Sequence, residues 1–374
     1  MLSPQHTPAC HPHHHSAAIP AADPVVLGPQ WAEQASSLLM AVSEPMHDLA
    51  LAAAASIGQM LGARALASND DAAMTTVYQL LQHSMPAWGA GGAENQTVTP
   101  LHATCLALAL HIRSTTLVRQ VLIDAVADFS PSSQGQTVKS AISYLYYAGL
   151  GYAGLQDCES ALRFWACTLA FPARAISQVA IAAYKHYVLM YVRLHGKCPS
   201  LPDYVSPIVT GALPGYVSEY QTLAQAIADG NATLAMDTLQ EHAQQWKADG
   251  TATAAAAATQ SIPCHKLRRA ASVYSRAPLA RISQVAQMTE EEVLAAIPLL
   301  NSLPGAQVQL ELLPDNSVRV TSTYDVPEAE RAGALAAQLQ RITGLQSRLQ
   351  ALHDALRASP AVAGYIAHAH SAVQ

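Results

Sequence analysis

The sequence predicts a mainly α-helical fold, in which a right-handed solenoid of paired helices precedes a small module with a β-hairpin and then one long helix. Three observations carry this prediction. Apolar residues recur every three or four positions from residue 31 to about residue 196. Two short helical patterns precede two alternating segments between residues 279 and 321. Leucines then recur at helical spacing through residues 327–357.

The composition indicates an α-helical protein without a membrane span. Hydrophobic residues make up 51% of the 374 positions and charged residues 12%, and much of the apolar share is alanine, the strongest helix former. No apolar run reaches the roughly 18 residues that a span needs, and the best candidate, residues 177–192, is interrupted by Lys185 and His186. The six cysteines form no C-x-x-C pair, and their irregular spacing favours buried thiols in a reducing compartment over a disulfide framework.

Residues 1–29 are rich in proline, histidine and alanine without helical or strand periodicity, which predicts a disordered tail. The tail contains a histidine tract, namely His11, His13, His14 and His15. In a flexible segment such a tract is expected to bind cations incidentally rather than functionally. The first basic residue is Arg64, so we expect neither a secretory signal nor an organelle transit peptide at this end.

A TPR-like helical-repeat solenoid is predicted for residues 30–200. In the segment YYAGLGYAGLQDCESALRFW, Gly149, Tyr152, Ala161 and Trp165 have the spacing of the small and aromatic key positions of such a repeat. Two short helices meet there at a close-approach glycine. The aromatic residues of this region are expected in the core rather than in a partner groove: Tyr144, Tyr146, Tyr147, Tyr152, Phe164 and Trp165.

Residues 201–325 predict the last helical pairs, followed by a compact module at 275–322. Two helical pieces, YVSEYQTLAQAIADG and NATLAMDTLQEHAQQWKADG, end at Gly230 and Gly250, as helix C-caps do. An alanine-rich stretch follows and is closed by Pro263, which cannot continue a helix interior without losing a hydrogen bond.

The module has the order of a winged helix: helix, turn, helix and hairpin. Its first helix carries Leu279, Ile282, Val285 and Ala286 on one face, and Thr289 with Glu292 forms a capping box that opens the second. VQLEL and VRVT then alternate apolar and polar residues around the turn LPDNS. We expect partner contacts in this wing at Val308, Leu310, Leu312, Val318 and Val320.

A winged helix raises the question of DNA binding. The second helix begins TEEEVLAAIPLLN, with three glutamates and no lysine or arginine, so its approach to phosphate would be repulsive. Together with the net charge of −6, this favours a protein partner. The basic group Lys266, Arg268 and Arg269 lies before the module, where ion pairs with neighbouring subunits or simple solvation are expected.

Residues 326–374 predict a long helix and a short tail. Its apolar residues step by three or four positions, the spacing of a partner-helix seam: Leu335, Leu339, Ile342, Leu345, Leu349, Leu352 and Leu356. Packing on its own domain and packing in an intersubunit bundle are both compatible with this stripe. The intersubunit bundle is preferred over packing on the same domain, because the family that the sequence resembles implies it.

The order of solenoid, winged helix and terminal seam helix resembles the PCI family of scaffold proteins, which occur in the proteasome lid, the COP-nine signalosome and translation initiation factors. Within that family the sequence resembles one subunit of the signalosome over about residues 95–325. The segments that carry the resemblance are TPLHATCLALAL (99–110), YYAGLGYAGLQDCESALRFW (146–165), AISQVAIAAYKHYVLMYVRLHGK (175–197), LPDYVSPIV (201–209) and ARISQVAQMTEEEV (280–293). The block 146–209 is the specific part.

The resemblance implies a scaffold subunit without cofactor, in nucleus and cytoplasm, for the assembly that removes the ubiquitin-like modifier Nedd from cullins. It implies that winged helices join edge to edge in an open ring and that terminal helices gather in a bundle. Subunits one and eight are the implied neighbours, and cullin-RING ligases are implied as indirect partners. Two alternatives remain: a proteasome lid scaffold, against which YKHYVLMYVRLHGK argues, and a nucleic-acid-associated winged-helix protein.

The zinc isopeptidase of such an assembly needs an upstream glutamate, a His-x-His pair and an aspartate some residues later. No glutamate precedes the histidine pairs between His11 and His15, and only four residues follow the pair His368 and His370. Phosphate-loop and nucleophile-elbow motifs are missing from the sequence, and the G-x-G-x-x-G match GLGYAG (149–154) lies within the predicted helical hairpin rather than between a strand and a helix, as dinucleotide binding would require. The sequence therefore predicts a protein that is not an enzyme and binds no metal or cofactor.

Overall fold

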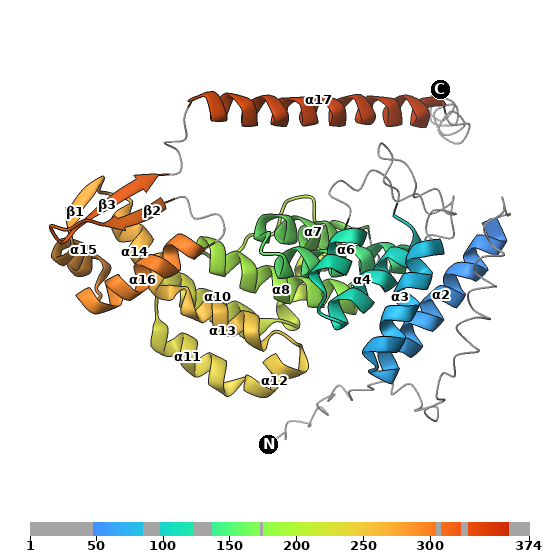
Figure 1. Ribbon diagram of the computed structural model, residues 1–374, viewed down its shortest axis with the longest axis horizontal. Coiled ribbons are helices and arrows are strands. Elements are labelled where there is room, and N and C mark those ends of the chain that lie inside the picture. The colour runs from blue at the N-terminus through green and yellow to red at the C-terminus, as the bar shows by residue number, and fades with distance from the viewer. Residues whose placement is uncertain are drawn as a thin grey trace, which may run out of the picture. The chain divides into compact units, whose positions relative to one another are not determined.

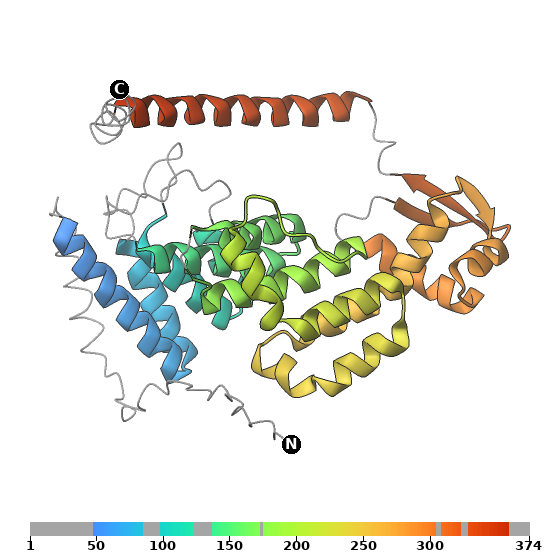
Figure 2. The ribbon, with the colours of Figure 1, turned by 180° about the vertical axis from the view of Figure 1, so that it is seen from behind.

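The computed structural model describes residues 48–84, 98–122, 137–172, 175–303, 308–322 and 328–358. Contacts divide the chain into two units, residues 1–262 and 263–374, and each is described by itself. The predicted fold class is confirmed, because Figures 1 and 2 show helices with one small sheet in the second unit. The predicted tail at residues 1–29, the histidine tract and the pair His368 and His370 lie outside the described residues.

The first unit is built of helices that pack on their neighbours in chain order. Its elements are α2 (Asp48–Ser68), α3 (Asp71–Ser84), α4 (Pro100–His111), α5 (Thr115–Val121), α6 (Val138–Gly154), α7 (Cys158–Ala170), α8 (Gln178–His195), α9 (Pro207–Ala212), η2 (Leu213–Gly215), α10 (Ser218–Asp229), α11 (Ala232–Glu241), α12 (Ala243–Ala248) and α13 (Ala252–Gln260). Helix α4 packs on α2 and α6, α6 on α7, α7 on α8, and α8 on α10 and α13. One hydrophobic core runs through these layers, from Ala55 to Ile262.

Local sequence explains where these helices begin and end. Ser177 caps α8 by accepting the amide of Ala180, and Gly196 ends that helix with φ 62°, in the left-handed region that glycine adopts without strain. The predicted cap Gly230 ends α10 with φ 73°. Gly250 also has positive φ, but the piece before it is split into α11 and α12 because His242 leaves helical geometry, with φ −101° and ψ 23°.

The start of α14 (Ile262–Ala271) shows how Pro263 is accommodated. Helix α13 ends at Gln260, before the proline, as the sequence predicts. Pro263 then lies in the first turn of α14, where its missing N–H removes no intrahelical hydrogen bond.

The second unit is a winged helix with three strands rather than the predicted hairpin alone. Its elements after α14 are β1 (Arg276–Pro278), α15 (Leu279–Ala286), α16 (Glu290–Ser302), β2 (Val308–Leu312), β3 (Ser317–Ser322) and α17 (Glu328–Ala358). The strands are antiparallel in the order β1-β3-β2, with Ala277 opposite Val318 and Leu310 opposite Val320. A separate core fills this module.

Two predictions about its helices have different outcomes. The capping box at the start of α16 is confirmed, since Thr289 and Glu292 each accept the other's backbone amide. Val285, which is predicted on one face of α15 with Leu279, Ile282 and Ala286, differs from these three buried residues because it is 42% exposed. At about 100° per residue it lies roughly 60° beyond Ile282, outside the arc that Leu279, Ile282 and Ala286 share.

The edge of β2 that faces away from β3 is occupied by a side chain. Asn301, near the end of α16, donates from Nδ2 to the carbonyl of Leu310, and its Oδ1 accepts the Leu310 amide, both at 2.9 Å. Both backbone groups of Leu310 are therefore satisfied without a further strand.

The thiols fit the prediction in part. Cys105, Cys158 and Cys264 are buried and free, whereas Cys167 and Cys198 are exposed, so the expectation that these cysteines are buried is wrong for the last two. Within the described ranges, no helix combines the length and apolar character needed to cross a bilayer.

Candidate functional site

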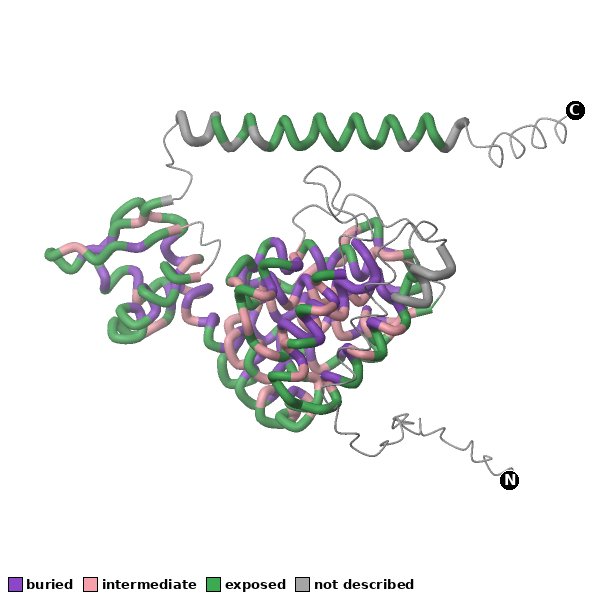
Figure 3. Tube along the Cα trace, turned by 45° about the vertical axis from the view of Figure 1, so that its right-hand side comes forward, coloured by how far each residue is buried: buried purple, intermediate pink, exposed green. Residues whose placement is uncertain are grey.

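Helix α17 presents the predicted seam as an open apolar stripe. The exposed fractions are 57% for Leu335, 57% for Leu339, 50% for Ile342, 57% for Leu345 and 71% for Leu349. The side chains of Leu352 and Leu356 lie outside the described residues. Figure 3 shows the described part of α17 as exposed along its length, in contrast to the buried interiors of the two units. A row of large apolar side chains in water is typical of a surface that binds a partner.

The five wing residues predicted to contact a partner have different surroundings. Leu310 and Val318 are 3% and 0% exposed and belong to the core of the winged helix, so they hold the module itself together. Val308 and Val320 are half-buried against that core. Leu312 is 44% exposed and is the wing residue open to a partner.

The second helix of the winged helix has an acidic start and an apolar exposed side. Glu290, Glu291 and Glu292 form the first turn of α16 and are exposed. Further along, Leu294 and Leu299 are 40% and 52% exposed. This surface carries no cation for a phosphate backbone, which agrees with a protein partner.

The basic group before the module is partly enclosed. Arg268 lies with a guanidinium nitrogen 3.1 Å from Nδ1 of His265, on the same helix α14. Burial lowers the pKa of Arg268, with the neighbouring Arg269 acting in the same direction. Lys266 is half-buried and Arg269 exposed.

In the first unit, the four residues that predict the repeat lie on the packed helices α6 and α7, and two of them, Gly149 and Trp165, are in close contact. Tyr152, Ala161 and Trp165 are buried, and a Cβ on Gly149 would lie 2.3 Å from Nε1 of Trp165. The indole of Trp165 donates to the carbonyl of Tyr146 at 3.3 Å. Only a glycine allows α6 and α7 to approach this closely.

A half-buried histidine joins this contact to the next helix. His186 of α8 stacks on Trp165 with ring centroids 5.4 Å apart and tilts against Tyr146 at 6.0 Å. Burial lowers the pKa of His186 to about 4. The imidazole is therefore neutral at physiological pH.

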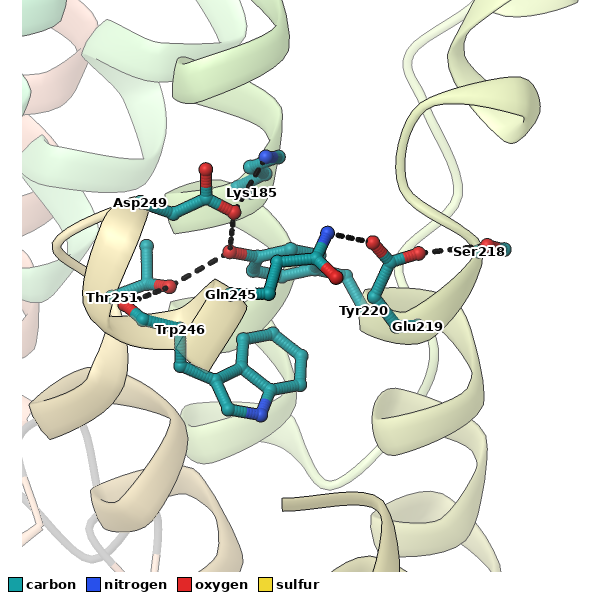
Figure 4. Close-up of polar contacts among 8 residues, drawn as sticks. All are labelled: Lys185, Ser218, Glu219, Tyr220, Gln245, Trp246, Asp249 and Thr251. Carbon is teal, nitrogen blue, oxygen red and sulfur yellow. Dashed lines mark hydrogen bonds and ion pairs between the residues drawn. The ribbon is translucent and has the colours of Figure 1, made fainter. Parts of the chain in front are cut away.

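Next to His186, a polar network ties α8 to the last helical pairs (Figure 4). Nζ of Lys185 lies 2.6 Å from Oδ2 of Asp249, and the Tyr220 hydroxyl donates to the same oxygen at 2.8 Å. The ammonium also lies 5.2 Å from the centroid of the Tyr220 ring, a cation–π distance. Burial raises the pKa of Tyr220, and Asp249 adds to the shift, so this hydroxyl remains a donor.

The network continues around the turn that follows α12. The hydroxyls of Tyr220 and Thr251 are 2.7 Å apart, and Gln245 donates to Glu219, which also accepts from Ser218 at 2.7 Å. Beneath them, the Trp246 ring packs edge-on against Tyr220 with centroids 4.4 Å apart. These contacts fix the position of α10 and α13 on α8.

No sequence pattern predicts this network as a whole. Its signal was Lys185, a charged residue inside an otherwise apolar helix, which requires a buried partner. The partner Asp249 follows 64 positions later, in a polar segment typical of the protein surface. No regular spacing in the sequence therefore links it to Lys185.

The described residues contain no cluster of three or more histidine, cysteine or acidic side chains able to hold a metal ion. Exposed apolar side chains are present on the described surface, both in the seam of α17 and on the winged helix. Such surfaces are suited to binding proteins.

Comparison with known proteins identifies the helical repeats. Residues 69–209 match the family described as COP9 signalosome complex subunit 3, N-terminal helical repeats. The predicted resemblance is confirmed. The matched region contains α3–α8, and with them the Gly149 contact and Lys185.

Two COP9 signalosome subunit 3 proteins are similar to the chain. The COP9 signalosome complex subunit 3 of Dictyostelium discoideum is 21% identical over 153 residues, which are 41% of this chain and 37% of that protein. The COP9 signalosome complex subunit 3 of Drosophila melanogaster is 25% identical over 120 residues, 28% of this chain and 27% of that protein. The chain thus matches between a quarter and two fifths of each relative.

Proposed function

We propose that the chain is a non-catalytic scaffold subunit of a COP9 signalosome, the assembly that deneddylates cullins and thereby regulates cullin-RING ubiquitin ligases. The similarity to subunit 3 supports membership of this complex. The observation that carries the scaffold role is the exposed seam of α17, whose apolar side chains have no covering among the described residues.

The proposed partners are other signalosome subunits, with subunits one and eight as neighbours and cullin-RING ligases as indirect partners. In this proposal the terminal helix enters an intersubunit bundle and the winged helix contacts a neighbouring winged helix. Because Asn301 occupies the edge of β2 at Leu310, we place that contact at β1 or at exposed side chains such as Leu312. The proposed location is nucleus and cytoplasm, without metal, cofactor, membrane or nucleic acid.

Affinity purification of the tagged full chain from its own cells, followed by mass spectrometry, tests this proposal. The expected result is near-stoichiometric recovery of the remaining signalosome subunits. Recovery of proteasome lid subunits instead would reassign the scaffold to the other complex. Recovery of nucleic acid that is lost as salt increases would favour the winged helix as a nucleic-acid reader.

A further inference from the structure

The seam of α17 follows a heptad pattern that assigns a place to each flanking residue. Leu335, Ile342, Leu349 and Leu356 are seven positions apart, and Leu345 and Leu352 lie three positions after the second and third of them. In the notation a to g, these are positions a and d of a helix that packs against another helix.

The positions beside such a seam, e and g, decide which helix can pair with it. From residue 334 to residue 355 they are Ala334, Leu339, Arg341, Gln346, Arg348, His353 and Ala355. Arg341 and Arg348 occupy the same position in successive heptads, and both are exposed. No carboxylate lies among these seven flanking positions.

This arrangement disfavours pairing of α17 with a second copy of itself. In a parallel pair, Arg341 would face Gln346 and Arg348 would face His353 of the other copy. In an antiparallel pair, arginines would face arginines. Neither orientation gives the guanidinium groups a carboxylate, and the second brings like charges together.

We propose that α17 selects an amphipathic helix of another protein whose flanking positions carry Glu or Asp. The apolar seam supplies the binding surface, and Arg341 and Arg348 supply the preference for acidic flanks. This inference rests on the proposed function, because it describes the chemistry of the partner in the terminal-helix bundle.

The test measures binding of the full chain to three labelled four-heptad peptides by fluorescence anisotropy. Two carry leucine at a and d, with either Glu or Lys at every e and g position, and the like charges keep each peptide from pairing with itself. The third has Glu flanks and alanine at a and d. At low salt we expect the Glu peptide to bind at least about fivefold more tightly than the Lys peptide, because Arg341 and Arg348 can each form an ion pair with a glutamate of the Glu peptide. The ratio should shrink at high salt, and the alanine peptide should not bind.

Charge variants separate the role of the two arginines from a general effect of charge. Arg341→Glu with Arg348→Glu should reverse the preference to the Lys peptide. Arg341→Gln with Arg348→Gln should abolish it. Gln340→Glu with Ser347→Glu changes the net charge by the same amount as the glutamine variant, but on the opposite face of the helix, and should leave the preference unchanged. Circular dichroism confirms that each variant keeps its helix content.

Equal affinity for the Glu and Lys peptides, binding of the alanine peptide, or no binding of any peptide would overturn the inference. So would a stable homodimer in analytical ultracentrifugation that Leu345→Asp dissociates. Incorporation of the chain into a signalosome without any peptide preference would reject the inference and leave the proposed function standing. A clear preference without incorporation would reject the proposed function instead.

Discussion

The ammonium of Lys185 and the carboxylate of Asp249 are in contact at 2.6 Å, although the two residues are 64 positions apart. Their side chains are 13% and 24% exposed, and the Tyr220 hydroxyl completes the contact. This pair connects the repeat helices that match the subunit 3 family with the last helical pairs, which lie beyond the match.

Replacing Lys185 with methionine should destabilise the first unit by about 2 kcal/mol, because Asp249 loses its countercharge in a largely buried site. Urea unfolding followed by tryptophan fluorescence measures this, since Trp165 and Trp246 both lie in that unit. Lys247→Met is the matched control, an exposed lysine two positions from Asp249. Equal effects of the two substitutions would show that the pair contributes nothing.

Gly149→Ala should destabilise the same unit by roughly 1 to 3 kcal/mol, because the new Cβ would overlap the rigid indole of Trp165. Gly154→Ala, in the last turn of the same helix, has open space around its Cβ and should be neutral or slightly stabilising. The same unfolding measurement compares the two. A harmless Gly149→Ala would contradict the close approach of α6 and α7.

The stability of the first unit should decrease as pH falls from about 6.5 towards about 4. Burial lowers the pKa of both His102 and His186 to about 4, so the unfolded chain binds their protons first. Each histidine contributes a slope of about 1.4 kcal/mol per pH unit within that window, and stability is fully present above it. Unfolding free energies measured at a series of pH values give this slope.

His186→Phe keeps an aromatic ring on Trp165 and removes one titrating group. It should therefore reduce the slope by about 1.4 kcal/mol per pH unit. His83→Gln removes an exposed histidine of α3 and should leave the slope as it is. If both variants titrate like the parent chain, the acid sensitivity has another origin.

Leu345→Asp with Leu349→Asp should prevent the chain from entering the proposed complex while both units stay folded. Two carboxylates in the seam would face the partner helix without a countercharge, which is strongly disfavoured. Pull-down with the other subunits measures assembly, and circular dichroism measures folding. Gln340→Asp with Ser347→Asp places the same charges on the opposite face of α17, where assembly should be retained.

The sequence predicts those features that depend on neighbouring residues. The capping box of Thr289 and Glu292, the alternation in β2 and β3, and the close approach at Gly149 all lie in short segments, so periodicity and spacing reveal them. The arrangement of polar groups around Asp249 depends on contacts between distant segments, and no local pattern reports it.

Strand β1 was missed for the same reason. It has three residues, too few to show alternation, and it forms because its backbone pairs with β3, which lies far along the chain. The exposure of Val285 does not follow from the sequence, because the width of the buried face of α15 depends on which elements of the module pack against that helix. Similarly, the burial of Leu310 and Val318 follows from the sheet lying on the core of the module.

The side chain of Asn301 bears on what happens to a copy of the chain that has not yet met its partners. An uncovered strand edge is a template on which other chains stack and aggregate. By occupying both backbone groups of Leu310, Asn301 removes the centre of the β2 edge from such stacking. At the other edge, β1 is three residues long and ends in Pro278, which has no amide hydrogen to offer. The sheet of an unassembled chain is thereby protected against edge-to-edge stacking, and the exposed apolar stripe of α17 remains the surface on which such a chain would aggregate.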